Sequence, residues 1–300
     1  MIGGNYNIGA FLNSLSKKTK NFAVFNSLLK KELCLEEFMK TNEDRYFDFG
    51  NGISSMFSVA SGFSARGKTP ILFGYSDLII SRAYDQIRND FCLNNMNVRI
   101  VGVGSGFDNG LRGGAHQFFE EVGILSGLFN MKIYSPSSLS GLYGLLERSM
   151  GDFGPVYFRL PLSLPDELVL EPVVFDRDFS NEIVIITYGK MVEVAKEVVT
   201  LFKEDGVSIS LLSVDEVFPF NYRKFQPLLF AKNVFLIEDQ NRNGLFSEIS
   251  RSLVLSGEKA SIHFLGIQGR FSESGKPLNL MKKYELDFLS LYGKIKEKLV

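Results

Sequence analysis

Short apolar runs alternate with amphipathic stretches through the first half of the chain. Five of these runs have no polar face, which is typical of strands that are buried on both sides of a sheet. They are Phe22–Phe25, Thr69–Phe73, Val98–Val103, Lys132–Tyr134 and Val156–Arg159. The stretches between them are long enough for helices. This alternation predicts an α/β domain with a parallel sheet.

A second alternation of the same kind occupies the later part of the chain. It predicts strands at Ile183–Thr187, Val207–Leu212, Asn233–Glu238 and Ser261–Leu265, and helices at Met191–Asp205, Leu245–Ser256 and Tyr284–Val300. Between the two parts, the segment Leu162–Phe179 contains proline and aspartate and lacks periodicity, which is typical of a linker. The sequence therefore predicts two doubly wound domains with mainly parallel sheets, residues 1–174 and residues 175–300.

Composition narrows the classes of protein to consider. A chain of 300 residues that is 45% hydrophobic and 22% charged can bury two ordinary cores. The net charge is only -1, with basic and acidic residues well mixed, so the chain has no basic stripe for a nucleic acid. No apolar run reaches a membrane-spanning length and the start resembles no targeting segment, so we expect a cytoplasmic protein without membrane contact.

The two cysteines predict no special chemistry. Cys34 and Cys92 have neither metal-ligand spacing nor a C-x-x-C arrangement, so we expect reduced thiols. No metal-ligating set is predicted in this chain.

The most informative motif runs from Arg45 to Met56 and reads R-Y-F-D-F-G-N-G-I-S-S-M. It resembles the pyrimidine-binding motif of transketolase-like thiamine diphosphate enzymes, R-F-F-N-V-G-I-A-E-Q-N-M. In that family the glutamate binds N1′ of the cofactor's aminopyrimidine and favours loss of the thiazolium C2 proton. Ile53 stands at the position of this glutamate, and shifting the match by two residues places Ser55 there instead.

Four further blocks extend the resemblance over essentially the whole chain. They are Arg82–Asp90 (R-A-Y-D-Q-I-R-N-D), Gly113–Glu121 (G-G-A-H-Q-F-F-E-E), Gly154–Leu160 (G-P-V-Y-F-R-L) and Phe271–Tyr284 with its Ser-Gly-Lys-Pro turn. The resemblance covers only the pyrimidine-binding and C-terminal domains of a full-length transketolase. Nothing resembles the G-D-G…N motif that holds Mg²⁺ and the diphosphate in that family.

The resemblance implies a set of cofactor-binding residues: Gly50, Ile53, Tyr75 and Leu78. Tyr75 matches the first of two family aromatics, and Leu78 falls on the second, which stacks on the pyrimidine. Leu78 can still cover the ring by apolar contact. Ile53 is either a substituted position in a working site, as in the related glyoxylate carboligase, or part of a decayed cofactor site.

The resemblance also implies substrate-binding residues. His116 falls on the family's active-site histidine, whose imidazole can bond a hydroxyl or transfer a proton. Arg112 stands at an acidic family position, and its guanidinium could bind a carboxylate or phosphate, although a solvated loop arginine is the alternative. Asp77 is a candidate displaced acid for a cofactor nitrogen. Gly104 and Leu162 replace a family histidine and arginine, which leaves the choice of substrate open.

The function implied is that of the small, C-terminal subunit of a two-chain transketolase-like enzyme. Such an enzyme transfers a two-carbon ketol unit, or performs a related carboligation, on sugar or sugar-phosphate substrates. Thiamine diphosphate and Mg²⁺ would be held mainly by an N-terminal, diphosphate-binding partner subunit, in a heterotetramer with a homodimer contact.

Two alternatives come from other classes. The first is a non-catalytic homologue that acts as a structural or regulatory partner, as the loss of the glutamate suggests. The second is the β subunit of a 2-oxoacid dehydrogenase, against which the Gly113–Glu121 run and the Ser274–Pro277 tail argue.

Overall fold

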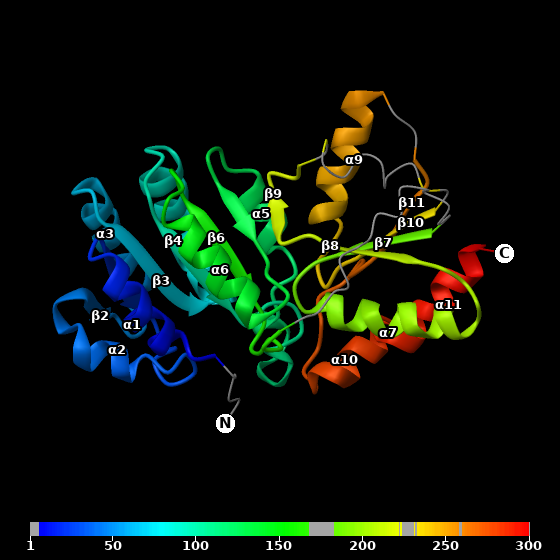
Figure 1. The fold of residues 1–300 in the computed structure, drawn as a ribbon, viewed down its shortest axis with the longest axis horizontal. Helices are drawn as coiled ribbons and strands as arrows, with labels where there is room; N and C mark the ends of the chain where they lie inside the picture. The colour runs from blue at the N-terminus through cyan, green and yellow to red at the C-terminus, as the bar shows by residue number, and fades with distance from the viewer. Residues whose placement is uncertain are drawn as a thin grey trace.

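The computed structural model describes residues 6–167, 183–221, 223, 231, 233–257 and 260–299, which form two sheets side by side (Figure 1). The first sheet has seven strands in the order β2-β1-β3-β4-β6-β5-β9, and the second has four in the order β11-β10-β7-β8. Every strand pair is parallel except β5 with β9. The predicted fold class, α/β with two mainly parallel sheets, is confirmed. The predicted domain boundary near residue 175 lies outside the described residues.

The strands are short and most of them are buried. They are β1 (Phe22–Asn26), β2 (Tyr46–Asp48), β3 (Thr69–Tyr75), β4 (Arg99–Val103), β5 (Lys132–Tyr134), β6 (Val156–Leu160), β7 (Ile183–Thr187), β8 (Ser210–Ser213), β9 (Glu216–Phe218), β10 (Asn233–Ile237) and β11 (Ile262–Leu265).

The helices connect these strands and cover both sheets. They are α1 (Ile8–Lys18), α2 (Glu36–Thr41), α3 (Ile53–Ala65), α4 (Ser76–Gln86), α5 (Glu121–Ser126), α6 (Leu139–Ser149), α7 (Met191–Glu204), α9 (Leu245–Ser256), α10 (Pro277–Lys283) and α11 (Phe288–Leu299). Among the described residues, no helix is long and apolar enough to cross a membrane.

Local chemistry sets several of these boundaries. The Ser138 side chain accepts a hydrogen bond from the Gly141 N–H and caps α6, while Pro277 occupies the first turn of α10, where no intrahelical N–H is needed. Gly257 ends α9 in the left-handed conformation, with φ of 72°.

Two predicted elements differ from the observed ones. The expected strand at Val207 begins instead at Ser210, because the Val207 N–H bonds to the Phe202 carbonyl and closes the end of α7. The expected C-terminal helix from Tyr284 is divided, since Glu285 adopts a positive φ of 56° and separates α10 from α11. Strands β2 and β9 were not expected, because each is only three residues long and includes an acidic residue, so neither forms a continuous apolar run.

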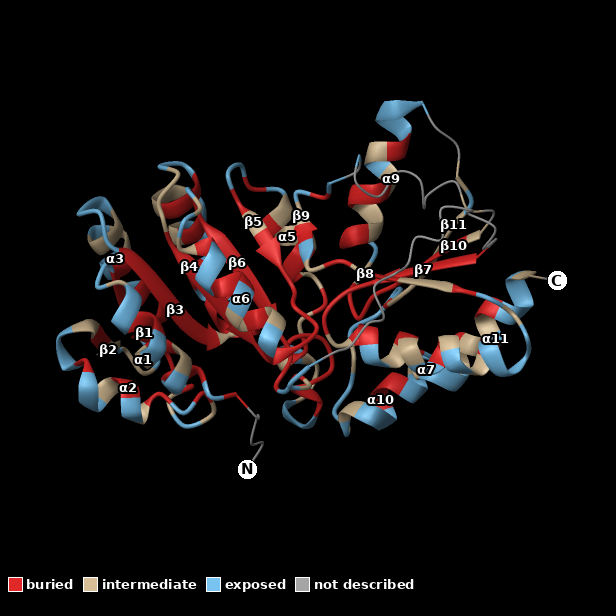
Figure 2. Cartoon of the chain, viewed as in Figure 1, coloured by how far each residue is buried: buried red, intermediate tan, exposed pale blue. Residues whose placement is uncertain are grey.

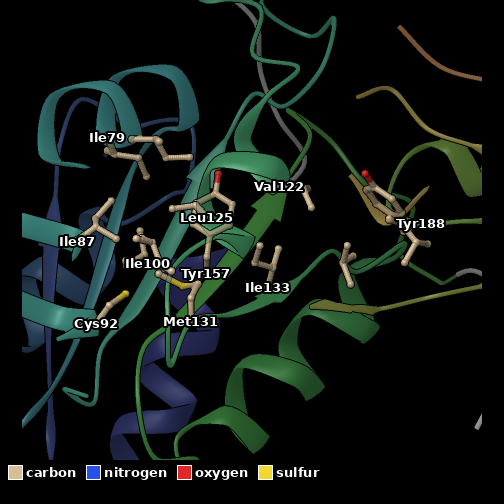
Figure 3. Packing of buried hydrophobic residues seen from close by; sticks show 14 of the residues in the cluster. Ile79, Ile87, Cys92, Ile100, Val122, Leu125, Met131, Ile133, Tyr157 and Tyr188 are labelled. Atoms are coloured by element: carbon tan, nitrogen blue, oxygen red, sulfur yellow. The ribbon is translucent and has the colours of Figure 1, made fainter. Parts of the chain in front are cut away.

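Each face of the first sheet packs against its own apolar cluster. Helices α3, α4 and α5 cover one face, and α1, α2 and α6 cover the other. The red strands in Figure 2 lie between these helical layers. Figure 3 shows the first cluster, in which Tyr157 of β6 lies among Ile100, Leu125 and Met131. Burial of these side chains is the main favourable contribution to folding of this part of the chain.

A buried ionic network joins the two sheets. Arg159 of β6 is fully buried, and its Nε lies 2.7 Å from Oε1 of Glu121, at the start of α5. Its Nη2 lies 2.8 Å from Oδ1 of Asp239, which follows β10 in the second sheet. Burial alone would lower the pKa of Arg159, but the carboxylates of Asp239 and Glu121 raise it above its ordinary value. The guanidinium therefore stays charged at the junction.

Glu238 lies next to this network and anchors helix α9. Its carboxylate accepts hydrogen bonds from the Tyr188 hydroxyl and from the backbone N–H groups of Leu245 and Phe246, each at 2.8 Å. These two N–H groups belong to the first turn of α9, where a negative charge is favourable. Burial raises the pKa of Glu238 to about 7, although these three donors oppose the shift.

We expect Arg159→Met to lower the free energy of unfolding by about 3–5 kcal/mol, because two buried carboxylates lose their counter-charge. Denaturant unfolding measures this change. The triple variant Arg159→Met/Glu121→Gln/Asp239→Asn removes the stranded charges and should recover part of the loss. Equal losses in the single and triple variants would show that uncompensated charge is not the cause.

The raised pKa of Glu238 predicts a specific pH dependence of stability. Glu238 binds its proton more tightly in the folded state than in the unfolded chain, where the pKa of a glutamate is about 4.3. Protonated Glu238 therefore stabilises the folded state at low pH. This stabilisation is lost as pH rises through about 7. Between about pH 4.5 and 8, the unfolding free energy of the native chain should fall by roughly 3 kcal/mol relative to Glu238→Gln.

Exposed Glu193 of α7 provides the control for this experiment, since Glu193→Gln removes a carboxylate without touching the buried site. The difference between the native chain and Glu193→Gln should stay constant over the same pH range. If the unfolding free energies of the native chain and of Glu238→Gln changed with pH in parallel, the raised pKa of Glu238 would be refuted.

Candidate functional site

The residues predicted to bind cofactor and substrate gather at the carboxyl edge of the first sheet. Strand β2 leads into the turn at Gly50 and then into α3, which begins at Ile53. Strand β3 ends at Tyr75, immediately before α4, and the loop after β4 carries Arg112 and His116. Because the strands are parallel, all of these connections leave the same edge, where ligands of open α/β sheets bind.

Ile53 and Leu78 form an apolar wall beneath this edge. Ile53 is 2% exposed at the start of α3, Leu78 is 9% exposed in the first turn of α4, and both belong to one apolar cluster with Met56. The half-buried ring of Tyr75 packs against the same cluster. The side chain that the sequence match sets against the family's glutamate is therefore buried and apolar, and it offers no hydrogen bond.

The turn before α3 is fixed by its own hydrogen bonds. Gly50 has a positive φ of 50°, which a glycine adopts readily. Its N–H donates to Oδ1 of Asp48 at 3.1 Å, and its carbonyl accepts from the Ser27 hydroxyl at 2.6 Å. These contacts set the direction in which α3 starts, and hence the position of Ile53.

Arg112 lies over the ring of Tyr75. Its Cζ is 4.7 Å from the ring centroid, within the range of a cation–π contact. The side chain is exposed, and no carboxylate lies within ion-pair distance of it in the part of the chain that the structure describes. Its planar donor groups are therefore held on an aromatic surface and remain available for an anion.

His116 makes a short contact with Asp77. The distance from His116 Nδ1 to Asp77 Oδ2 is 2.6 Å, and it joins the loop after β4 to the first turn of α4. Asp77 is 5% exposed, whereas the His116 side chain is 31% exposed. The carboxylate of Asp77 thus pairs with the imidazole.

Segments from the second half of the chain hold the loop that carries these residues. Gln240 Nε2 donates to the Phe118 carbonyl at 3.3 Å, and the Asn241 N–H donates to the Phe119 carbonyl at 2.9 Å. Further along, Gln117 Nε2 donates to the Glu273 carbonyl at 2.8 Å. The site loop therefore takes its conformation from contacts with both halves.

Glycine is required where these segments approach the loop. A Cβ at Gly114 would lie 2.3 Å from the Ser272 carbonyl oxygen, and a Cβ at Gly106 would lie 2.2 Å from Oδ2 of Asp239. The glycine-rich composition of this loop allows the backbones to pack closely.

Two positions that the sequence match sets against a family histidine and arginine make structural contacts. Gly104 has a positive φ of 84°, and its carbonyl accepts a hydrogen bond from Asn109 Nδ2 at 3.1 Å. Leu162 is buried, and its N–H donates to Oδ2 of Asp108 at 2.5 Å. Neither position presents a charged or imidazole group to the site.

Sequence reasoning missed the Arg159 network and the pairing of Asp77 with His116. The first had a readable signal, because an arginine inside the otherwise apolar run Val156–Leu160 needs buried counter-charges. The second had none, since the two residues are 39 positions apart and meet only through the fold.

The donor set of the site can be tested against the cofactor that the family resemblance implies. Ile53, Leu78 and Tyr75 match the apolar face of an aminopyrimidine ring in chemical character. These side chains provide no carboxylate for N1′. Among the described residues, no three histidine, cysteine or acidic side chains gather as metal ligands.

Comparisons with known proteins give two family-model matches and a similar solved structure. Residues 9–165 match the family model described as the pyrimidine-binding domain of transketolase, and residues 181–274 match core domain II of pyruvate:ferredoxin oxidoreductase. Among solved structures, one titled as a split-gene transketolase, inactive β4 tetramer, superposes with a TM-score of 0.83 at 22% identity. The match covers 96% of this chain and 95% of that one.

Three curated relatives have similar sequences over most of this chain. One subunit of the apulose-4-phosphate transketolase of Actinobacillus succinogenes is 26% identical, with 83% of each chain covered. The putative transketolase C-terminal section of Methanocaldococcus jannaschii is 25% identical over 97% of this chain and 94% of its own. The 1-deoxy-D-xylulose-5-phosphate synthase of Clostridium kluyveri is 26% identical over 94% of this chain, but only 46% of its own length is covered.

Proposed function

Because the chain belongs to the transketolase family through its pyrimidine-binding domain, we propose that it is the small subunit of a two-chain, thiamine diphosphate-dependent enzyme of that family. The proposal is supported by the share of each relative's length that this chain matches. The chain matches most of the length of relatives named as a transketolase subunit or as a C-terminal section, but less than half of a single-chain synthase. In the family, the half of the synthase that this chain does not match is the half that holds the diphosphate.

The site residues divide the work of binding between cofactor and substrate. Tyr75, Leu78 and Ile53 would hold the pyrimidine ring by apolar contact, and the turn at Gly50 sets the start of α3, which carries Ile53. The partner subunit would hold Mg²⁺ and the diphosphate. When bound, thiamine diphosphate supplies the nucleophilic carbon for transfer of a two-carbon ketol unit or a related carboligation.

Arg112 and His116 face the substrate side of the proposed site. The guanidinium of Arg112 has no carboxylate partner among the described residues and lies on Tyr75, so it binds the phosphate or carboxylate of a sugar-like substrate. His116 binds a substrate hydroxyl and accepts its proton. These two residues give the site an anion-binding group and a base on one short loop.

A second candidate function is that of a non-catalytic homologue with a structural or regulatory role. The apolar, buried Ile53 in place of the family's acid favours it. In that case the complex with the large chain would form without supporting carbon–carbon bond chemistry.

Calorimetry on this chain co-expressed with a diphosphate-binding transketolase large subunit separates these functions. We expect thiamine diphosphate with Mg²⁺ to bind the complex and not the isolated chain, because each chain contributes one end of the site. Tyr75→Ala should weaken binding by about tenfold through loss of ring contact. Tyr292→Ala, on α11 in the second half, is the matched control and should have no effect.

Absence of cofactor binding by a well-formed complex would contradict the proposed enzyme and leave the structural role. Binding accompanied by turnover of a ketose donor would exclude the structural role.

A further inference from the structure

The pairing of Asp77 with His116 has no counterpart in the motifs that relate this chain to its family, and it determines what the imidazole can do. We propose that Asp77 is a positioning residue. It accepts a hydrogen bond from Nδ1–H of neutral His116, so that Nε2 becomes the proton-accepting nitrogen turned away from the carboxylate. This inference rests on the proposed function, which supplies the substrate hydroxyl that would give its proton to Nε2.

The chemistry of the contact places the shared proton on the imidazole. At 2.6 Å, the distance between Nδ1 and Oδ2 is that of a charge-assisted hydrogen bond. A carboxylate can only accept, so the proton belongs to Nδ1. The hydrogen bond made by one ring nitrogen determines the tautomer, and the other nitrogen is then the acceptor.

The burial of Asp77 holds the carboxylate in place. Its side chain is only 5% exposed, and Oδ1 has no hydrogen-bond partner among the described residues. The residue lies in the first turn of α4, where the free N–H groups of the helix favour a negative charge. The carboxylate is thus held rigidly by its helix, and its specific polar contact in the described part of the chain is the imidazole.

The position of the imidazole is fixed from the loop side as well. The His116 N–H donates to the Gly113 carbonyl at 3.0 Å in a short 3₁₀ turn, and the neighbouring Gln117 is bonded to the Glu273 carbonyl. Nε2 makes no hydrogen bond with any described residue, and part of the side chain is exposed. Nε2 is therefore the ring nitrogen that is left without a protein partner in the described part of the chain, as binding of a substrate hydroxyl requires.

This arrangement prepares His116 to take a proton from a substrate hydroxyl at Nε2. The O–H bond of the substrate hydroxyl breaks, its electron pair stays on oxygen, and the proton forms an N–H bond at Nε2. His116 then carries a positive charge, which the Asp77 carboxylate stabilises while Nδ1 keeps its own proton. Asp77 does not take up a proton, and the same proton returns from Nε2 when the transfer is complete.

The ring tautomer can be measured directly on the chain alone, without cofactor or partner. The chain has two histidines, and His263 lies on β11 stacked against Phe235, so His263→Gln leaves His116 as the only imidazole signal. In ¹⁵N-histidine-labelled protein at about pH 9, where an ordinary imidazole is neutral, two-bond ¹⁵N–¹H spectra should show the Nδ1–H form. Asp77→Ala should convert the signal to the Nε2–H form or to a mixture.

Asp85→Ala is the matched control, because Asp85 is an exposed carboxylate on the same helix. It should leave the tautomer unchanged, and thermal melts should show that all variants remain folded. An Nε2–H form in the parent protein, or a tautomer that Asp77→Ala does not change, overturns the inference.

Turnover by the assembled complex provides a second, separate readout. Asp77→Ala and His116→Ala should each lower kcat by about 10²-fold, and the double variant should lose little more, because Asp77 acts through His116. Additive losses overturn the positioning role. A native complex that binds no cofactor contradicts the proposed function, and the tautomer measurement then decides the pairing by itself.

Discussion

The buried guanidinium of Arg159 is the constraint on which the arrangement of the two sheets depends. A fully buried charge must be compensated within hydrogen-bonding distance, and the two carboxylates that compensate it come from different halves of the molecule. Glu121 begins the helix after the site loop, and Asp239 follows a strand of the second sheet. The requirement for both partners fixes the loop between β4 and α5 against the later part of the chain.

This constraint explains why the site uses residues so distant in sequence. The carboxyl edge of the first sheet brings Ile53, Tyr75 and Leu78 together, whereas Gln240 and Glu273 hold the loop that bears His116. The second half therefore acts on the site through its contacts with the loop. In the proposed enzyme, these contacts would position His116 as the base and Arg112 as the anion-binding group. The packing of α3 on α4 would position the apolar wall that faces the cofactor.

Much of the fold could be predicted because buried strands carry a strong local signal. The apolar runs at Phe22, Thr69, Ile183 and Asn233 each begin an observed strand. The three-residue strand at Glu216 could not be predicted, because its antiparallel pairing with β5 is decided by tertiary contact. The break at Glu285 was missed for a related reason, since apolar periodicity continues on both sides of a single left-handed residue.

In the candidate site, motif resemblance located Ile53, Arg112 and His116, and parallel topology explains why they share one edge. The resemblance did not reveal the contacts of Arg112 with Tyr75 and of Asp77 with His116, because both depend on how the loop after β4 meets the junction of β3 with α4.

The proposed function depends most on Ile53, which the sequence match sets against the glutamate that activates the cofactor in the family. The most direct test is the rate of hydrogen–deuterium exchange at C2 of thiamine diphosphate in the assembled complex, compared between the native chain, Ile53→Glu and Ile53→Gln. We predict that Ile53→Glu accelerates exchange and that Ile53→Gln, which has the same shape without the acid, does not. An exchange rate that Ile53→Glu leaves unchanged would contradict the placement of this residue against the pyrimidine.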